Sequence, residues 1–294
     1  MKERLNISII IPAKNEAESL VSLLPAIQKL IADAEIIVVN DGSTDKTQQV
    51  SEKSGVNVVN HPYSRGNGAA IKSGARAASG DIFVFMDADG QHRPEDIQGL
   101  LNRYNEGYDM IVGARGSESQ ASKARLFGNG LYNRIASYMT GQKIVDLTSG
   151  FRVVNAKKFK QFLYLLPNGF SYPTTITMAF FRAGYSVAYE PIVAPERIGK
   201  SHINILKDGM RFFLIIFKIG TLYSPMKLFF PASLVFFLTG LIYYIYTFFT
   251  DGRFTNMGVL LFSTSVLVFL LGLISEQITA LFYQTRSRSD DRVD

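Results

Sequence analysis

Two long uncharged runs near the carboxyl end constrain this chain more than any other feature of its sequence. Residues 228–249 and residues 257–275 contain no Asp, Glu, Lys or Arg. Each run approaches the roughly 20 residues that a helix needs to cross the hydrocarbon core of a bilayer. The alternative is a pair of buried helices in a soluble core, which would not normally sustain such runs. We therefore expect two transmembrane helices, at about residues 228–249 and 257–281, in a membrane segment of residues 225–283.

Basic residues flank these runs and predict their orientation. Four Lys or Arg residues lie between positions 207 and 227, three lie in the tail 284–294, and the connecting loop 250–256 carries one. The positive-inside rule then places both termini in the cytoplasm and the loop outside. The net charge of +6 fits a protein that lies against anionic lipid. Nucleic acid is the weaker alternative, because the basic residues gather beside the apolar runs.

The rest of the chain predicts a large α/β domain, residues 1–202, with no secretory signal peptide before it. Apolar and β-branched runs predict strands at residues 7–11, 35–39, 56–60, 82–86, 110–113 and 186–193. Helical patterns fall at residues 16–32, 44–54, 68–78, 94–106, 157–166 and 174–183. Strands separated by helices of this length predict βαβ units and a mostly parallel sheet. Residues 203–224 mix aromatic and basic side chains, which predicts an interfacial amphipathic helix, with an ordinary soluble helix as the alternative.

Two carboxylates follow the apolar strand at residues 82–86. Asp87 and Asp89 come directly after it, and Gln91 follows. Ligands of open α/β sheets bind outside the carboxyl ends of the strands. Mg²⁺ is commonly held there by one or two carboxylates together with substrate phosphates. The pattern therefore favours an enzyme that handles a metal-complexed diphosphate over a pair of acidic turn residues.

Three further loops are expected near the same edge of the sheet. Residues 12–16 follow the first strand, and residues 41–45 follow the second. Asp41 is suited to accept a hydrogen bond from a ribose hydroxyl or a base N–H group, whereas Asp45 more simply caps a helix. Residues 65–68 open a helix, and the N–H groups of a helix start attract phosphate.

Four ordered motifs give residues 5–200 a resemblance to a known family. The segments IIIPAKNE, VVNDGSTD, GNGAAI and MDADGQH resemble the successive motifs of family 2 glycosyltransferases, which have the GT-A fold. The later segments DLTSGFR and RIGKS, together with the two apolar runs, resemble the polyprenyl-phosphate branch of that family. That branch includes dolichyl-phosphate mannose synthases and bacterial polyprenyl-phosphate glucosyltransferases.

The resemblance implies substrates, a cofactor and roles for particular residues. A nucleotide diphosphate sugar would be bound by Pro12, Ala13, Asn15, Glu16, Asp41, Asn67, Lys72, Asp87 and Ala88. A divalent metal, Mg²⁺ or Mn²⁺, would be bound by Asp87, Asp89 and Gln91. The phosphate of a polyprenyl phosphate acceptor would be bound by Arg115, Arg125, Ser149, Arg197 and Lys200. Catalysis would depend on Asp89, Arg197 and Lys200.

The chain departs from the family pattern at two positions. Ala13 stands where the family usually has an aromatic residue. Asn129 stands where a serine often follows the arginine at position 125. The second departure leaves that part of the acceptor site open.

A stretch without acidic residues helps to decide whether the acceptor is a hydroxyl or a phosphate. No Asp or Glu lies between Leu147 and Tyr189. A hydroxyl acceptor must lose its proton as it attacks, which calls for a carboxylate base, whereas a phosphate monoester is already an anion at neutral pH. The resemblance implies that enzymes of this fold that glycosylate hydroxyls usually have their base in this region, so this stretch without acidic residues favours a phosphate acceptor, with Asp146 left open as a base.

These observations lead to one hypothesis and two alternatives. The hypothesis is a membrane-bound, metal-dependent, inverting transfer of one sugar to a polyprenyl phosphate at the cytoplasmic face. The alternatives are transfer to a hydroxyl of a lipid or glycan, and a non-catalytic membrane adaptor. The sugar, the nucleotide, an undecaprenyl or dolichyl acceptor, and a homo-oligomeric state stay open.

Overall fold

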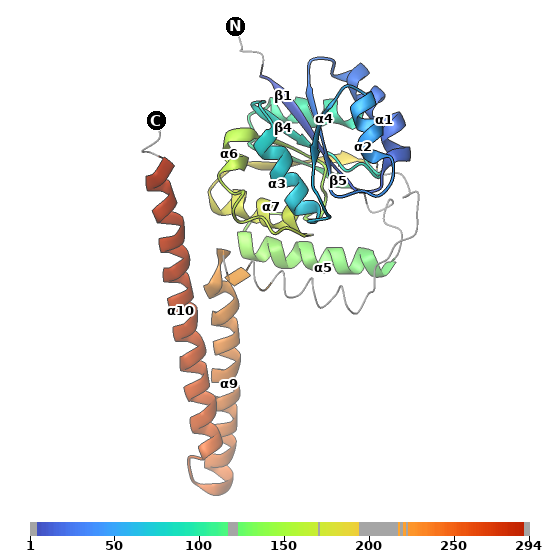
Figure 1. The fold of residues 1–294 in the computed structure, drawn as a ribbon. Helices are drawn as coiled ribbons and strands as arrows, with labels where there is room; N and C mark the ends of the chain where they lie inside the picture. Colours follow the sequence, from blue (N-terminus) through green and yellow to red (C-terminus); the bar gives the residue numbers. More distant parts are fainter. Residues whose placement is uncertain are drawn as a thin grey trace. The chain divides into compact units, whose positions relative to one another are not determined.

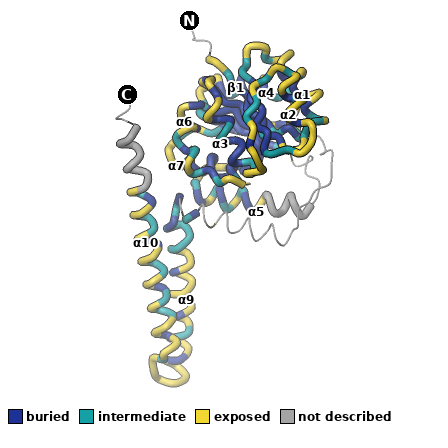
Figure 2. The backbone as a smooth tube through the Cα atoms, viewed as in Figure 1, coloured by how far each residue is buried: buried dark blue, intermediate teal, exposed yellow. Residues whose placement is uncertain are grey.

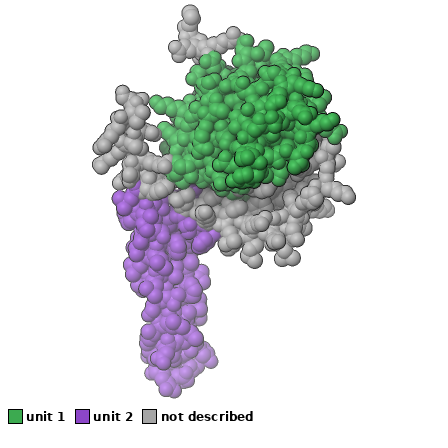
Figure 3. Space-filling model, viewed as in Figure 1, with its two compact units in different colours: residues 1–138, 142–208 green, residues 139–141, 209–294 purple. Residues whose placement is uncertain are grey.

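The computed structural model describes residues 5–116, 123–169, 171–193, 217, 220–221 and 223–290 of the chain. It divides into two compact units (Figure 3). The sheet unit comprises residues 1–138 and 142–208, and the hairpin unit comprises residues 139–141 and 209–294.

The sheet unit alternates strands and helices along the chain (Figure 1). Its strands are β1 (Ile7–Ala13), β2 (Glu35–Asn40), β3 (Asn57–Asn60), β4 (Ile82–Phe85), β5 (Met110–Arg115), β6 (Arg152–Asn155) and β7 (Val187–Ile192). Its helices are α1 (Ala17–Leu30), α2 (Thr47–Lys53), α3 (Asn67–Ala77), α4 (Asp96–Tyr104), α6 (Ala156–Lys160), α7 (Tyr172–Arg182) and most of α5 (Lys123–Thr140). The predicted α/β class is confirmed.

The seven strands form one sheet in the order β3-β2-β1-β4-β6-β5-β7. Only β6 runs antiparallel, because it pairs in that sense with both β4 and β5. The carboxyl ends of the parallel strands, and the amino end of β6, therefore share one edge of the sheet. This carboxyl edge brings together the loops that follow β1, β2, β3 and β4, the end of β5, and the segment that leads into β6.

Three elements differ from the sequence prediction. The short β6 was not expected, and neither was α5, whose sequence contains Gly128 and Gly130. Glycine in a helix interior costs about 1 kcal/mol relative to alanine, which weakens the helical pattern there. The helix predicted at residues 157–166 ends at Lys160, where hydrogen bonds from Phe162 N to Phe159 O and from Leu165 N to Phe162 O form tighter turns.

Helices cover both faces of the sheet. Leu24 of α1 and Leu100 of α4 join Ile11 and Val84 in one buried core. On the opposite face, the ring of Phe159 in α6 lies 4.6 Å from that of Phe85 in β4, and α3 also packs against the sheet through β1 and β2. The five inner strands, β2, β1, β4, β6 and β5, are accordingly buried along most of their length (Figure 2).

The hairpin unit contains two long apolar helices, α9 (Pro225–Asp251) and α10 (Asn256–Asp290). Helix α9 and the part Asn256–Leu281 of α10, with mean hydropathies of 2.0 and 2.5, are both long and apolar enough to cross a membrane. Only 11% and 17% of the apolar windows are buried, so the outward faces suit lipid rather than a protein core (Figure 2). Most of the amphipathic helix expected at residues 203–224 lies outside the described residues.

Small residues at intervals of seven form the seam between these two helices. The buried positions are Ser233, Gly240 and Thr247 on α9, and Gly258, Ser265, Gly272 and Thr279 on α10. The hydroxyl of Ser265 donates to the carbonyl oxygen of Ser233 over 2.8 Å. A Cβ atom at Gly240 would lie 3.1 Å from the Cβ of Leu261, so glycine permits the close approach of the helices.

Candidate active site

The loops after β1 and β2 are joined by hydrogen bonds at the carboxyl edge. The backbone N–H of Asn15 donates to Ser43 Oγ over 3.0 Å, and that of Thr44 donates to Asn15 Oδ1 over 2.8 Å. Asp45 accepts from the backbone N–H of Thr47 at 2.9 Å near the start of α2, as a capping residue does. These contacts hold the expected donor-binding residues Pro12, Ala13, Asn15 and Glu16 beside the loop that begins at Asp41.

The buried carboxylate of Asp41 organises the next loop, residues 61–66. Its Oδ1 lies 2.7 Å from His61 Nδ1 and accepts from the backbone N–H of Arg65 at 2.8 Å. Its Oδ2 accepts from Ser64 Oγ at 2.8 Å and from the backbone N–H of Gly66 at 2.9 Å. Both oxygens are thus engaged by one loop. Direct contact between Asp41 and a nucleotide stays a prediction.

The start of α3 is braced by residues 166–169. The backbone N–H groups of Gly68 and Ala69 donate to the carbonyl oxygens of Gly169 and Asn168 at 3.1 and 2.9 Å. Lys72 Nζ donates to the carbonyl oxygen of Leu166 at 3.0 Å. The N–H groups expected to attract phosphate therefore have protein acceptors. Roles for Lys72 and for Asn67, whose buried Oδ1 has no hydrogen-bond partner among the described residues, stay predictions.

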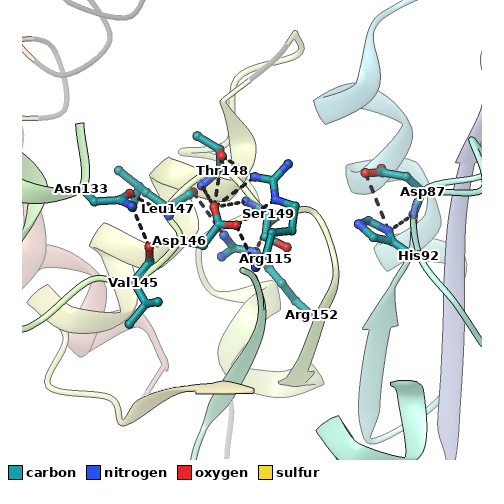
Figure 4. Close-up of polar contacts among 10 residues, drawn as sticks. All are labelled: Asp87, His92, Arg115, Asn133, Val145, Asp146, Leu147, Thr148, Ser149 and Arg152. Atoms are coloured by element: carbon teal, nitrogen blue, oxygen red, sulfur yellow. Dashed lines mark hydrogen bonds and ion pairs between the residues drawn. The ribbon is translucent and has the colours of Figure 1, made fainter. Parts of the chain in front are cut away.

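The Asp87–Asp89 turn is fixed by His92 and abuts the segment that leads into β6. The backbone N–H of Asp87 donates to His92 Nδ1 at 3.0 Å (Figure 4). The imidazole stacks on Phe151 with ring centroids 4.8 Å apart, and burial lowers the pKa of His92 to about 4. A Cβ atom at Gly150 would lie only 2.8 Å from Asp87 Oδ2. The two segments therefore meet at the Asp87 carboxylate.

Arg115, at the end of β5, is held in place by Asp146 and Thr148. Its Nε and Nη2 donate to the two oxygens of Asp146 at 2.8 and 3.1 Å, and Nη2 also donates to Thr148 Oγ1 at 2.6 Å (Figure 4). The same carboxylate accepts from the backbone N–H groups of Thr148 and Ser149. The Oγ of Ser149 is buried and has no hydrogen-bond partner among the described residues.

The electrostatics of Asp146 do not suit a general base. Burial alone would raise its pKa, but the hydrogen bonds and the charge of Arg115 outweigh burial, and the pKa is lowered. A base at neutral pH benefits from a raised pKa and a lone pair directed at the substrate. The pKa of Asp146 is lowered instead, and its oxygens already accept hydrogen bonds from Arg115 and from the backbone N–H groups of Thr148 and Ser149.

Arg152, the last residue of the motif DLTSGFR, is a buried cation that the sequence analysis did not single out. Its side chain is 0% exposed. Nε donates to the carbonyl oxygen of Ser149 at 2.8 Å, and Nη1 donates to Thr177 Oγ1 at 2.6 Å. The guanidinium thus braces the segment 146–151 from inside the domain.

The side chains of three residues expected to bind the acceptor phosphate lie outside the described part of the chain. Arg125 belongs to α5, but its side chain lies outside the described part of the chain. Arg197 and Lys200 also lie outside the described residues. They follow β7, which ends at the carboxyl edge because it is parallel to β5.

The carboxylates of Asp87 and Asp89 fit a hard divalent cation in their chemistry. No group of three or more His, Cys, Asp or Glu side chains suited to a metal occurs in the described ranges. The protein would therefore supply two carboxylates and the amide oxygen of Gln91, and the donor diphosphate and water would complete the coordination. Mg²⁺ sites are commonly built this way.

A mostly parallel sheet with two carboxylates and an oriented arginine at its carboxyl edge agrees with the GT-A fold that the sequence motifs led us to expect. Residues 8–163 match the model of the family described as glycosyl transferase family 2, and residues 224–281 match the GtrB C-terminal hairpin. The chain therefore belongs to glycosyl transferase family 2 and is a glycosyltransferase.

Named relatives support the resemblance to the polyprenyl-phosphate branch. A dolichyl-phosphate hexose transferase of Haloferax volcanii is 26% identical over 206 residues, which cover 69% of this chain and 89% of that protein. An undecaprenyl-phosphate 4-deoxy-4-formamido-L-arabinose transferase of Pseudomonas fluorescens is 35% identical over 188 residues, 58% of this chain and 55% of that protein.

A solved structure confirms the fold. Glucosyl-3-phosphoglycerate synthase of Mycobacterium tuberculosis, in complex with Mn²⁺, UDP and phosphoglyceric acid, matches with a TM-score of 0.62 and 21% identity. The match covers 74% of this chain and 80% of that one.

The lowered pKa of Asp146 predicts a pH-dependent contribution to stability. Because the folded-state pKa lies below the ordinary value of 3.8, this contribution is complete above that pH and is lost as the pH falls through the folded-state pKa. We expect Asp146→Asn to lower the thermal unfolding midpoint at about pH 7, and to approach the wild-type midpoint below about pH 4. Midpoints measured in detergent across this range test it. A difference that stays constant down to about pH 3 would contradict the prediction.

Proposed function

We propose that this chain transfers a single sugar from a nucleotide diphosphate sugar to a polyprenyl phosphate, with inversion and with a divalent metal. The observation that carries the proposal is the Arg115–Asp146 pair at the carboxyl edge. It orients a guanidinium group there. Its hydrogen bonds also engage the oxygens of Asp146, the carboxylate that the sequence left open as a base. An oriented cation beside a carboxylate whose oxygens are already engaged suits an acceptor that is already an anion.

In the proposed reaction, an oxygen of the acceptor phosphate attacks the anomeric carbon from the face opposite the diphosphate. The new C–O bond forms as the bond to the diphosphate breaks, and the diphosphate leaves with the electron pair. No proton has to be removed from the acceptor. A metal held by Asp87 and Asp89 would stabilise the negative charge of the leaving diphosphate.

Arg115 is arranged to bind an acceptor phosphate. In the described part of the chain, its Nη1 has no hydrogen-bond acceptor, because Asp146 and Thr148 engage only Nε and Nη2. The side chain is 26% exposed, so part of the guanidinium group is open to a ligand in this proposal. Charge-assisted hydrogen bonds from Arg to phosphate are short and strong. Ser149, Arg197 and Lys200 are proposed to complete this phosphate site.

The membrane arrangement is part of the proposal. Helices α9 and α10 would span the bilayer, and the sheet unit and both termini would be cytoplasmic, as the distribution of Lys and Arg indicates. The dolichyl-phosphate and undecaprenyl-phosphate relatives support a lipid-linked acceptor. The structure complexed with Mn²⁺ and UDP supports a divalent metal and a nucleotide diphosphate leaving group.

The acceptor is tested by comparing a polyprenyl phosphate with the corresponding polyprenol. We expect the purified protein in detergent to transfer label from a suitable nucleotide sugar to the phosphate, and at least about 100-fold more slowly to the alcohol. A panel of UDP- and GDP-sugars identifies the donor, and EDTA is the control for the metal. Equal rates with phosphate and alcohol would show that a base operates and would overturn the proposal.

A further inference from the structure

The loop between β3 and α3 presents an aromatic side chain at the carboxyl edge. Tyr63 is 68% exposed. The residues that follow it in the loop are held by hydrogen bonds to Asp41. The strand before the loop, β3, pairs in parallel with β2, so the loop lies at the edge where β2 also ends. Tyr63 therefore lies on the side of the sheet edge that carries Asp41, away from β4 and its carboxylates.

The backbone on both sides of Tyr63 is held against the loop that follows β2. Asp41 accepts hydrogen bonds from Ser64 Oγ and from the backbone N–H groups of Arg65 and Gly66. Gly42, with φ of 65°, packs against the backbone of residues 63 and 64. A Cβ atom at Gly42 would lie only 2.5 Å from Ser64 N and 2.8 Å from Tyr63 Cα. The ring of Tyr63 is thus carried by a backbone with little freedom, which lowers the entropic cost of using it in binding.

The neighbouring loops offer no comparable surface to a nucleobase. Ala13, where the family pattern has an aromatic residue, is only 2% exposed. Asn15 uses its backbone N–H and its side-chain oxygen within the protein. Both oxygens of Asp41 are engaged by the loop 61–66. A flat aromatic face beside these residues comes from Tyr63.

We propose that the ring of Tyr63 stacks on the nucleobase of the donor, on a loop whose backbone Asp41 holds in place. The inference rests on the proposed function, because it requires a nucleoside diphosphate at the carboxyl edge. Every nucleobase has a π face that an aromatic side chain can stack on, so Tyr63 contributes affinity rather than a choice among bases.

The absence of tryptophan from the chain makes the test direct. Tyr63→Trp gives the full-length protein a single indole, whose fluorescence reports stacking of a base. We expect saturable quenching on titration with UDP or GDP in detergent with Mg²⁺ or Mn²⁺ present. Tyr108→Trp is the matched control, because Tyr108 precedes β5 at the opposite edge of the sheet, and its fluorescence should not respond.

Calorimetry of the substituted proteins completes the test. Tyr63→Ala should weaken nucleoside diphosphate binding by about tenfold, and Tyr63→Phe should bind within about twofold of wild type. If the wild type binds UDP or GDP but Tyr63→Ala binds equally well and the indole of Tyr63→Trp is not quenched, the stacking role is wrong and the proposed function stands. If neither nucleotide, nor any other of a panel of nucleoside diphosphates, binds the wild type, the donor assignment fails and the inference fails with it.

Discussion

Asp89→Asn should lower the rate of sugar transfer by at least about a thousandfold while the protein stays folded. The substitution keeps the shape of the side chain and an oxygen able to accept from the backbone N–H of Gln91, which donates to Asp89 Oδ1 at 3.2 Å. It removes the charge that the proposed metal–diphosphate complex requires. Carboxylate charge at such a metal contributes several kcal/mol to stabilisation of the transition state.

The measurement is turnover of labelled nucleotide sugar at saturating metal, together with the thermal unfolding midpoint. Asp81→Asn is a matched control, because Asp81 directly precedes β4, at the end of the strand opposite Asp89. It should keep most of the activity. Retention of more than about a tenth of wild-type turnover by Asp89→Asn, or activity indifferent to EDTA, would refute the metal assignment.

Gly150→Ala should lower the transfer rate by about a hundredfold, although it adds a single methyl group. That methyl carbon would lie 2.8 Å from Asp87 Oδ2 and 3.3 Å from Asp87 Cγ, so the carboxylate would have to move. The glycine itself is fixed, because the hydroxyl of Tyr172 donates to its carbonyl oxygen at 3.1 Å. A displaced Asp87 would hold the metal and diphosphate in the wrong geometry.

Gly130→Ala provides the control, since a Cβ there meets nothing within 4 Å. It should leave the rate unchanged and, within α5, slightly raise stability. Gly150→Val should be more damaging than Gly150→Ala, and the concentration of metal needed for half-maximal activity should rise in the same order. Wild-type rates and metal dependence in Gly150→Ala would show that the contact between Gly150 and Asp87 is irrelevant to the reaction.

The sequence predicted the loops after β1, β2 and β4 well, because each of these strands has a clear apolar pattern and polar residues come soon after it. It did not predict which polar groups are left for a ligand. Asp41 accepts a hydrogen bond from the backbone N–H of Arg65, and Lys72 Nζ donates one to the carbonyl oxygen of Leu166. Each bond joins residues that lie far apart in the sequence. A residue type shows what a side chain can donate or accept, but only the fold shows whether the protein has already used it.

The hydrogen-bond partners of the buried Arg152 could not be predicted from the sequence either. Its neighbours in sequence gave no sign that β6 would insert antiparallel between β4 and β5. The four residues of β6 are too few for a period to be recognised. Once the strand is placed, Arg152 lies beside Phe85 and Val112 and must satisfy its donors with Ser149 and Thr177.

The seven-residue spacing of the seam between α9 and α10 has a mechanical consequence. An α-helix has 3.6 residues per turn, so a contact that recurs every seven residues drifts unless the helices wind around each other with a left-handed twist. We expect two helices wound together in this way to bend less than either helix would alone. The outward positions of the hairpin, such as Ile242 and Leu267, take no part in the seam and are exposed. In the proposed membrane arrangement these outward positions contact lipid, so substitutions there can follow the lipid composition without disturbing the seam.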